Sequence, residues 1–199
     1  MGRGYMNAGV PASVKNLRRH CSGVTLVELL VVIIIMGILS GIGVAGLRSA
    51  VANARIKDAA FNIASFMERT ANDARRLSTT LCVLRMDAQK LVTYVGECAT
   101  VKGAANKNDL TKTDSLILDT PNKILQDGEV TAVEALGDVN LVTDGAEFKP
   151  RQGLSAAPAK GFIAVQYGGD GRYGAAAKTN MRNSFFPMMK YDEGNWFKL

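Results

Sequence analysis

The side chains of this 199-residue chain that could act as nucleophiles, bases or metal ligands are few and scattered. The single histidine, His20, and one of the three cysteines, Cys21, stand together in a basic N-terminal stretch. The other cysteines, Cys82 and Cys98, lie far along the chain with no histidine near them in sequence. Beyond residue 20, a Ser-His or Cys-His nucleophile therefore has no base, and the commonest metal ligand is missing. We expect a protein that is not an enzyme, with no catalytic residue, metal site or cofactor.

One carboxylate stands out because an apolar segment follows it directly. From Leu29 to Leu47 no side chain carries a formal charge, and Glu28 comes immediately before this stretch. Nineteen residues form a helix of roughly 28 Å, which is enough to cross a hydrocarbon core of about 30 Å. Placing a carboxylate in a membrane-spanning helix costs a few kcal/mol of free energy. Its presence therefore indicates a functional role and a positively charged partner. Cleavage after Gly23 would create one, because the new α-amino group on Val24 would stand four residues before Glu28.

Residues 23–37 read GVTLVELLVVIIIMG. A glycine, an apolar residue, Thr, Leu, an apolar residue and Glu, followed by a long apolar helix, resemble the N-terminal signature of type IV pilins and pseudopilins. The resemblance implies that a membrane aspartyl peptidase, the prepilin peptidase, cuts after Gly23 and methylates Val24. It also implies that Glu28, the fifth residue of the mature chain, guides assembly by neutralising the Val24 amine of its own chain or of a neighbouring subunit.

The same resemblance implies a place in the cell and a set of partners. The protein would be a bacterial inner-membrane protein that spans the bilayer once, with its N-terminus in the cytoplasm and its head in the periplasm. Basic residues before the apolar run favour this orientation, although Arg48, Arg55 and Lys57 follow the run. The implied partners are the prepilin peptidase, other pilin or pseudopilin subunits, the inner-membrane assembly platform and the lipid bilayer.

The formal charge of +6 does not by itself indicate a nucleic-acid partner. Four of the basic residues fall in residues 1–23, and their removal leaves 20 basic against 18 acidic residues. Residues 149–199 keep a surplus of +5. Gly171-Arg172 there resembles the Gly-Arg motif through which some FimT-like minor pilins bind DNA, but Gly174 stands where the motif has a second arginine. Contact of Arg172 with DNA is therefore an alternative, and a nucleic-acid partner is not expected.

Two other interpretations of the apolar segment stay open. A secretory signal peptide has a core of 7–15 apolar residues and a small-residue cleavage site, which here only Gly43-Val44-Ala45 would offer. A plain membrane anchor explains the apolar run but neither Glu28 nor the Gly23–Val24 junction. Either would leave an anchored or secreted β-rich binding domain.

The predicted fold class is α+β, with a long N-terminal spine helix packed on a small antiparallel β-sheet head. Apolar or small residues recur every three or four positions from Leu47 to Leu77, and no proline interrupts this part of the chain. The first half of the helix would span the membrane, and its amphipathic second half would pack on the head. We expect a leader at 1–23 that is removed, a transmembrane and spine helix at 24–78, and a periplasmic head at 79–199.

After Leu77 the chain changes to short β-like runs between turn residues, which predicts six to eight antiparallel strands. Two of them, 79–85 and 90–95, should form a hairpin. The order of elements resembles the GspH/FimT branch of minor pseudopilins. The other expected strands are 115–118, 130–136, 139–142, 161–167 and a short one after residue 173, and the expected loops are 99–114 and 149–160.

The cysteines and a glycine-rich turn complete the set of candidate sites. Cys82 and Cys98 predict one disulfide that closes a short loop in an oxidising compartment, with two unpaired thiols as the alternative. Gly168–Arg172 lacks the phosphate-loop pattern and predicts a tight β-turn. A calcium site that combines Asp170 with a carboxylate of residues 109–119 has no regular ligand spacing to support it.

Overall fold

The computed structural model describes residues 24–126, 139–155, 160–181, 183–190 and 195–199. The chain divides into two compact units, Met1–Val44 and Ala45–Leu199, and each is described here by itself. One helix, α1 (Leu26–Arg76), contributes residues to both units.

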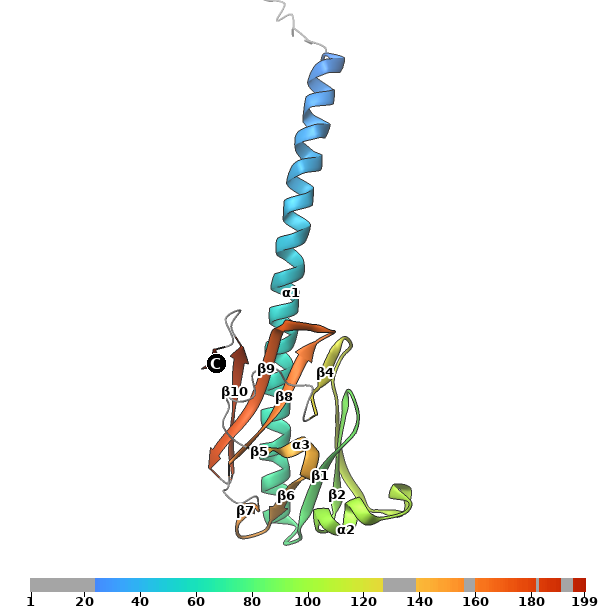
Figure 1. The fold of residues 1–199 in the computed structure, drawn as a ribbon, viewed down its shortest axis with the longest axis vertical. Coiled ribbons are helices and arrows are strands. Elements are labelled where there is room, and N and C mark those ends of the chain that lie inside the picture. The colour runs from blue at the N-terminus through green and yellow to red at the C-terminus, as the bar shows by residue number, and fades with distance from the viewer. Residues whose placement is uncertain (1–23, 127–138, 156–159, 182, 191–194) are drawn as a thin grey trace, which may run out of the picture. The chain divides into compact units, whose positions relative to one another are not determined.

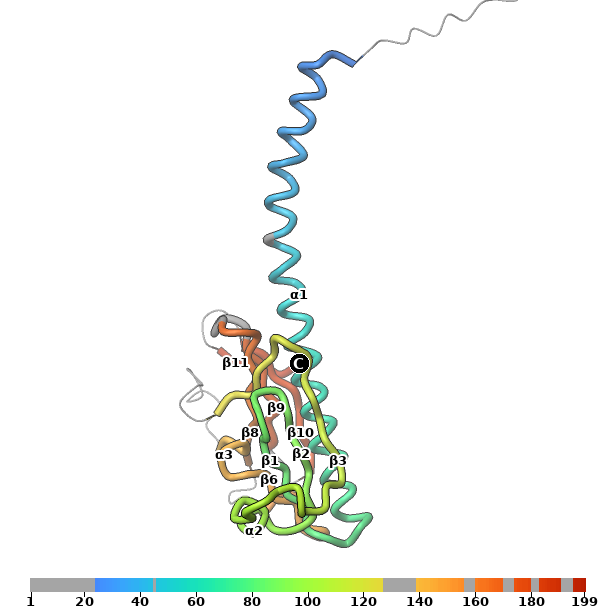
Figure 2. Tube along the Cα trace, turned by 90° about the vertical axis from the view of Figure 1, so that its right-hand side faces the viewer, coloured from blue at the N-terminus to red at the C-terminus, as the bar shows by residue number. Residues whose placement is uncertain are grey.

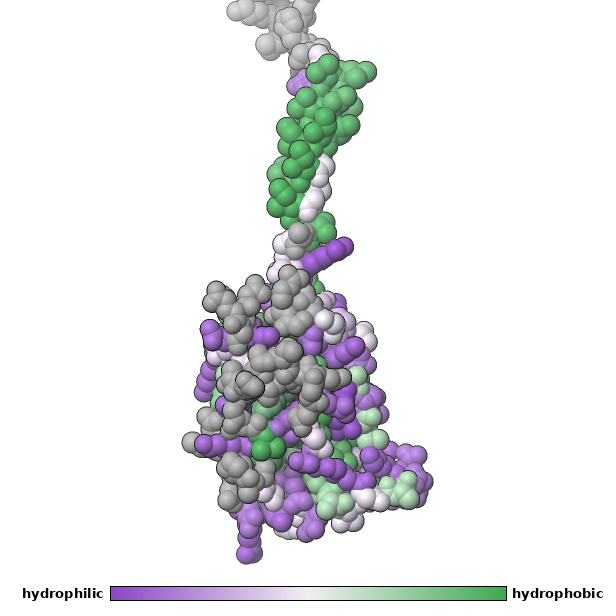
Figure 3. Space-filling model, in the orientation of Figure 1, coloured by the Kyte–Doolittle hydropathy of each residue, from purple (hydrophilic) through white to green (hydrophobic). Residues whose placement is uncertain are grey.

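The described part of the first unit is helical and apolar. Every residue from Val24 to Val44 is exposed, and the surface drawn in Figure 3 is hydrophobic over most of this stretch. By length and composition alone, α1 could cross a membrane. A helix with apolar side chains on all sides is stable only in an apolar environment, such as a lipid bilayer or a protein interior, because its exposure to water is unfavourable.

The second unit contains two β-sheets that pack against α1 (Figure 1). The first sheet has the order β3-β2-β1-β6-β7, and every pairing in it is antiparallel. Its strands are β1 (Leu81–Asp87), β2 (Lys90–Val95), β3 (Lys112–Ile117), β6 (Ala146–Lys149) and β7 (Gly153–Leu154).

The second sheet has the order β11-β10-β9-β8-β4. These strands also pair antiparallel, while the two residues of β5 pair with β8 in parallel. Its strands are β4 (Asn122–Ile124), β5 (Val139–Asn140), β8 (Gly161–Tyr167), β9 (Asp170–Met181), β10 (Ser184–Lys190) and β11 (Trp196–Lys198).

Three short helical turns connect these strands. They are α2 (Cys98–Gly103), the 3-10 turn η1 (Lys107–Asp109) and α3 (Leu141–Asp144). Asparagine side chains begin two of them, since Asn106 accepts the N–H of Asn108 and Asn140 accepts the N–H of Val142. Such caps satisfy backbone donors that a helix start leaves free.

One hydrophobic core joins α1 to both sheets, and Figure 2 shows the sheets along one side of the helix. Fully buried α1 side chains recur every three or four residues, which places them on a single helix face. From the sheets come Leu81, Val83, Leu91, Phe148, Ile163, Val165, Ala175, Ala177 and Phe185, and from α1 Ile56, Ala59, Ala60, Ile63, Ala64, Phe66, Met67, Ala71 and Ala74.

The α+β architecture with a long apolar helix is confirmed, and so is the hairpin of β1 and β2. The predicted helix end near Leu77 agrees with Arg76, and β8 covers the predicted 161–167. The expected strand at 130–136 lies outside the described residues. Within the described ranges the head has eleven strands in two sheets, so the prediction of six to eight strands was too low.

Four local predictions were wrong. The turn expected at 168–172 is confined to Gly168 and Gly169, and the short strand expected after residue 173 is the twelve-residue β9 (Asp170–Met181). The expected loop 99–114 contains α2, η1 and the start of β3, and Cys98 and Val101 bury one face of α2 despite its polar surroundings. The strand expected at 139–142 stops after Asn140, because the Asn140 side chain accepts the Val142 N–H and starts α3 instead. The expected loop 149–160 contains the two residues of β7.

A substitution at the centre of the α1 face tests this core. Ile63 is 0% exposed, so Ile63→Ala should lower the free energy of unfolding of the head by about 2–5 kcal/mol through lost burial and a cavity. Ser65, which is exposed two residues later on α1, supplies the matched control Ser65→Ala. Denaturant unfolding of the full chain in detergent, followed by the fluorescence of Trp196, measures both. Equal stabilities of the two variants would contradict the core as described.

Candidate functional site

Thr25 fixes the start of α1 and the position of Glu28. The Thr25 side-chain oxygen Oγ1 accepts the backbone N–H of Glu28 at 3.2 Å, and the Thr25 carbonyl accepts the N–H of Leu29 at 3.1 Å. A threonine followed three residues later by a glutamate is the sequence of a capping box at a helix N-terminus. The local sequence therefore determines that the helix begins at Leu26 and that Glu28 lies in its first turn.

The Glu28 carboxylate is exposed in the first unit. The first turn of a helix favours an anion, because the unpaired backbone N–H groups give it a partial positive charge. No ion pair joins Glu28 to another residue of the described ranges. Val24 is 69% exposed, so both members of the predicted amine–carboxylate pair are open to another molecule.

The structure describes the other predicted site residues, Gly23 of the cleavage site and Arg172 of the possible DNA contact, only in part. Gly23 lies outside the described residues, so the geometry of the Gly23–Val24 junction stays a prediction. Arg172 belongs to β9, which follows the turn at Gly168 and Gly169, but its side chain also lies outside the description. Nothing in the described ranges therefore favours contact of Arg172 with DNA. No cluster of three or more His, Cys, Asp or Glu side chains suited to a metal occurs among the described residues.

Comparison with known protein families identifies the N-terminal region. Residues 18–44 match the prokaryotic N-terminal methylation motif, which covers Gly23, Val24 and Glu28. No curated protein and no solved structure matches the chain significantly. The matched motif and the apolar α1 support a membrane-anchored bacterial subunit of the pilin or pseudopilin type. Proteins with this motif are structural subunits that a prepilin peptidase processes and that assemble with other pilins.

In the head, a disulfide joins Cys82 of β1 to Cys98 of α2, with the Cα atoms 5.1 Å apart. Both residues are buried in a small cluster on the first sheet. Gly145 fits against them with φ +85°, and a Cβ there would lie 2.9 Å from the Cys98 sulfur and 2.7 Å from Leu84 Cδ2. The Glu147 carboxylate accepts the Cys98 N–H at 2.9 Å. The disulfide and this hydrogen bond hold the start of α2 on the sheet.

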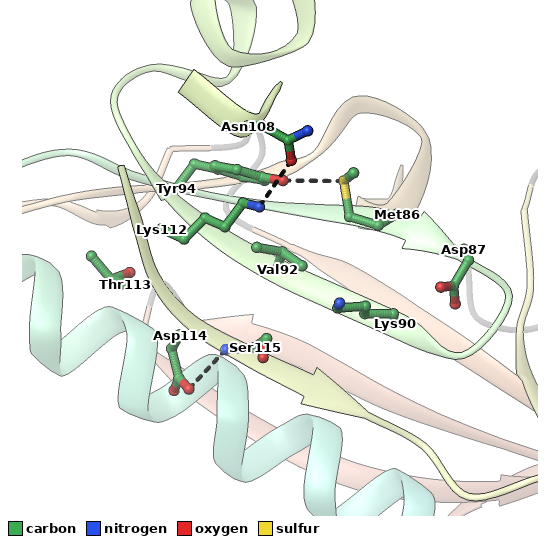
Figure 4. A pocket seen from close by; sticks show the side chains of 10 residues that line it. All are labelled: Met86, Asp87, Lys90, Val92, Tyr94, Asn108, Lys112, Thr113, Asp114 and Ser115. Atoms are coloured by element: carbon green, nitrogen blue, oxygen red, sulfur yellow. Dashed lines mark hydrogen bonds between the residues drawn. The ribbon is translucent and has the colours of Figure 1, made fainter. Parts of the chain in front are cut away.

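One pocket lined by described residues is a groove of about 680 Å³ on the first sheet, shown in Figure 4. Its wall combines apolar Met86, Val92 and the Tyr94 ring with polar and charged side chains. The hydroxyl of Tyr94 donates to the Met86 sulfur at 3.3 Å, and Lys112 Nζ donates to Asn108 Oδ1 at 3.4 Å. The lining residues are Met86, Asp87, Lys90, Val92, Tyr94, Asn108, Lys112, Thr113, Asp114 and Ser115.

Several polar groups of this groove already have partners within the head. Its two carboxylates are already engaged, because Asp114 pairs with Arg69 at 2.8 Å and Asp87 accepts the N–H of Gln89. Burial raises the pKa of the Tyr94 phenol, so Tyr94 keeps its proton and acts as a hydrogen-bond donor. The groove is not predicted from the sequence, because residues 99–114 read as a loop there. The alternating exposure of β3 becomes meaningful only after the register with β2 is known.

Removal of the disulfide should destabilise the head without changing its fold. The two cysteines are 16 residues apart, and a loop of this size contributes about 3 kcal/mol in the chain-entropy description. The double variant Cys82→Ala/Cys98→Ala should therefore unfold at a lower denaturant concentration than the wild type. A reducing agent should lower the midpoint of the wild type and leave that of the double variant unchanged. A reductant that has no effect on the wild type would show that the two thiols are unpaired in solution.

Proposed function

We propose that this chain is a minor pseudopilin or minor pilin that assembles through its N-terminal helix into a periplasmic filament. The machine would be a type II secretion system or a type IV pilus. In this proposal, residues 1–23 are removed, 24–78 form the anchor and spine, and 79–199 form the periplasmic head. The prepilin peptidase, other subunits and the inner-membrane assembly platform would be its partners.

The observation that carries this proposal is the exposed Glu28 directly before the uncharged stretch of α1, inside the matched methylation motif. An unpaired carboxylate at the edge of an apolar segment raises the cost of leaving the helix isolated in lipid. A neighbouring subunit that offers its Val24 amine would remove this cost and would fix the axial position of one helix against the next. The hydrogen bond from the Glu28 N–H to Thr25 Oγ1 fixes Glu28 in the first turn of α1, where its exposed carboxylate is accessible to such a neighbour.

The head supports a place in the GspH/FimT branch only through the order of its elements. A helix runs directly into a hairpin, and a late strand, the turn at Gly168 and Gly169, and the β9–β10 hairpin follow. The competing function, a receptor for DNA, depends on Arg172 and on the basic surplus of residues 149–199. Because no described contact favours that function, structural assembly is the better proposal.

Processing is the first step to test. Mass spectrometry of the chain from native membranes should find a mature protein that starts at N-methylated Val24. Replacement of the preceding glycine, Gly23→Val, should leave the chain at full length, because the peptidase would meet a branched side chain at its cleavage position. A chain that instead starts at Gly46 would identify a secretory signal and refute the pilin proposal.

The role of Glu28 is tested separately from processing. Glu28→Gln removes the charge and keeps the shape, so cleavage after Gly23 should continue while incorporation into filaments falls at least about tenfold, which corresponds to 1.4 kcal/mol. Asp58→Asn, at an exposed acidic position of α1 in the head, is the matched control and should assemble normally. Quantitative immunoblotting of sheared or cross-linked filaments measures incorporation. Normal assembly of the Glu28→Gln protein would rule out the amine–carboxylate pairing.

A further inference from the structure

A second cavity in the head collects positive charge. It has a volume of about 330 Å³, and three basic side chains from three different elements line it: Arg85 of β1, Lys102 of α2 and Lys107 of η1. Leu84, Gln126, Val142 and Thr143 complete the lining. None of the described lining residues is acidic, so this part of the cavity differs in charge from the groove of Figure 4.

The pairing of the strands explains why the cavity forms at this place. Strand β6 pairs with β1 only along Leu81–Val83, and its last pair joins Val83 to Ala146. Beyond Val83, no strand of the described ranges covers this edge of β1, and Leu84 and Arg85 line the opening. Lys102 bridges one side of it, since its Nζ donates to the Thr143 carbonyl at 3.2 Å and lies 3.5 Å from Asp144.

Arg85 is the residue that indicates a ligand. Its Nε is buried with no hydrogen-bond partner, and Arg85 takes part in none of the described ion pairs. A guanidinium donor withdrawn from water without an acceptor costs free energy, so proteins almost always pair such groups. An anion in the cavity would supply the missing acceptor and could receive parallel hydrogen bonds from the planar guanidinium.

We propose that this cavity, the Arg85 pocket, binds the carboxylate of an acidic side chain from a partner protein. Arg85 and Lys107 supply the positive charge, because Lys102 is already shared with Asp144. Leu84 and Val142 are 5% and 7% exposed and offer an apolar wall for the methylene groups of a glutamate or aspartate. Such a wall suits a carboxylate on an aliphatic stem better than a phosphate in a nucleic-acid backbone. The inference concerns the head alone and holds whether or not the chain enters a filament.

The test follows the Arg85 Nε–H by NMR in the ¹⁵N-labelled mature chain in detergent micelles at pH 6. The Arg85→Lys variant, which lacks this signal, identifies it. The probes are the capped peptide acetyl-Ala-Ala-Glu-Ala-Ala-amide, the same peptide with glutamine in place of glutamate, glutarate and inorganic phosphate. The glutamate peptide should shift the signal downfield in a saturable way, and the glutamine peptide should leave it unchanged. Lys107→Gln should weaken binding by about tenfold.

The controls separate this pocket from general attraction to a basic protein. Lys112→Gln makes the same change of charge in the groove of Figure 4 and should leave peptide binding unaltered. An equal loss in Lys112→Gln and Lys107→Gln would overturn the proposal, as would no shift with the glutamate peptide. Tighter binding of phosphate than of the peptide would also overturn it, and stronger binding of glutarate would show that the source is a free dicarboxylate and not a protein.

The chain's own acidic residues could occupy the pocket, and the same signal reports this outcome. Residues 127–138 follow Gln126 in sequence and contain Asp127, Glu129, Glu134 and Asp138. A signal that already lies downfield in the free chain and moves upfield in Glu129→Gln/Glu134→Gln would mean that a partner's carboxylate is not needed, which overturns the proposal. Thermal unfolding adds a second readout, since Arg85→Met should not lower the melting temperature of the free chain if the guanidinium has no partner there.

Discussion

The buried face of α1 between Ala52 and Ala74 is the constraint on which the described head depends. An isolated helix with a wide apolar stripe is unstable in water, and several strands of the head, such as β1 and β8, have apolar side chains of their own to bury. The apolar side chains of the helix and of the two sheets bury one another, because the inner side chains of the sheets and the apolar stripe of α1 form a single core. Small residues at Ala59, Ala60, Ala64, Ala71 and Ala74 let the strands approach the helix closely.

Polar contacts along α1 then connect particular segments to this core. Glu68 accepts the Phe185 N–H at 3.1 Å and so holds the start of β10, while Arg69 pairs with Asp114 of β3. The buried hydroxyls of Thr70 and Thr93 lie 3.4 Å apart between the helix and β2. Exposed ion pairs contribute little free energy by themselves. Together, these polar contacts favour one position of the strands along the helix, which apolar contacts alone would specify only weakly.

The two units place different demands on the same helix. In the first, apolar side chains face every direction and one carboxylate stands in the first turn, an arrangement that suits lipid or other helices and supports a pilin-type subunit. In the second, the helix is apolar on one face only, and the opposite face is open. The head surface also carries a mixed groove on β2 and β3 and the basic Arg85 pocket.

The sequence by itself determined the features that depend on local pattern. Charge-free residues in unbroken succession fixed the apolar part of α1, Thr25 and Glu28 fixed its start, and the β1–β2 hairpin followed from two β-rich runs around a short polar turn. Tertiary structure decided what depends on partners distant in the chain. Strands β6, β7 and β10 take their positions from neighbours across the sheets, and α2 owes its place to Cys82, Gly145 and Glu147. The sequence gives no sign that Arg85 Nε lacks a hydrogen-bond partner, because the strand pairing that leaves this edge of β1 open beyond Val83 forms only in the folded head. Local propensity is encoded over a few residues, whereas burial and charge isolation are properties of the assembled sheets.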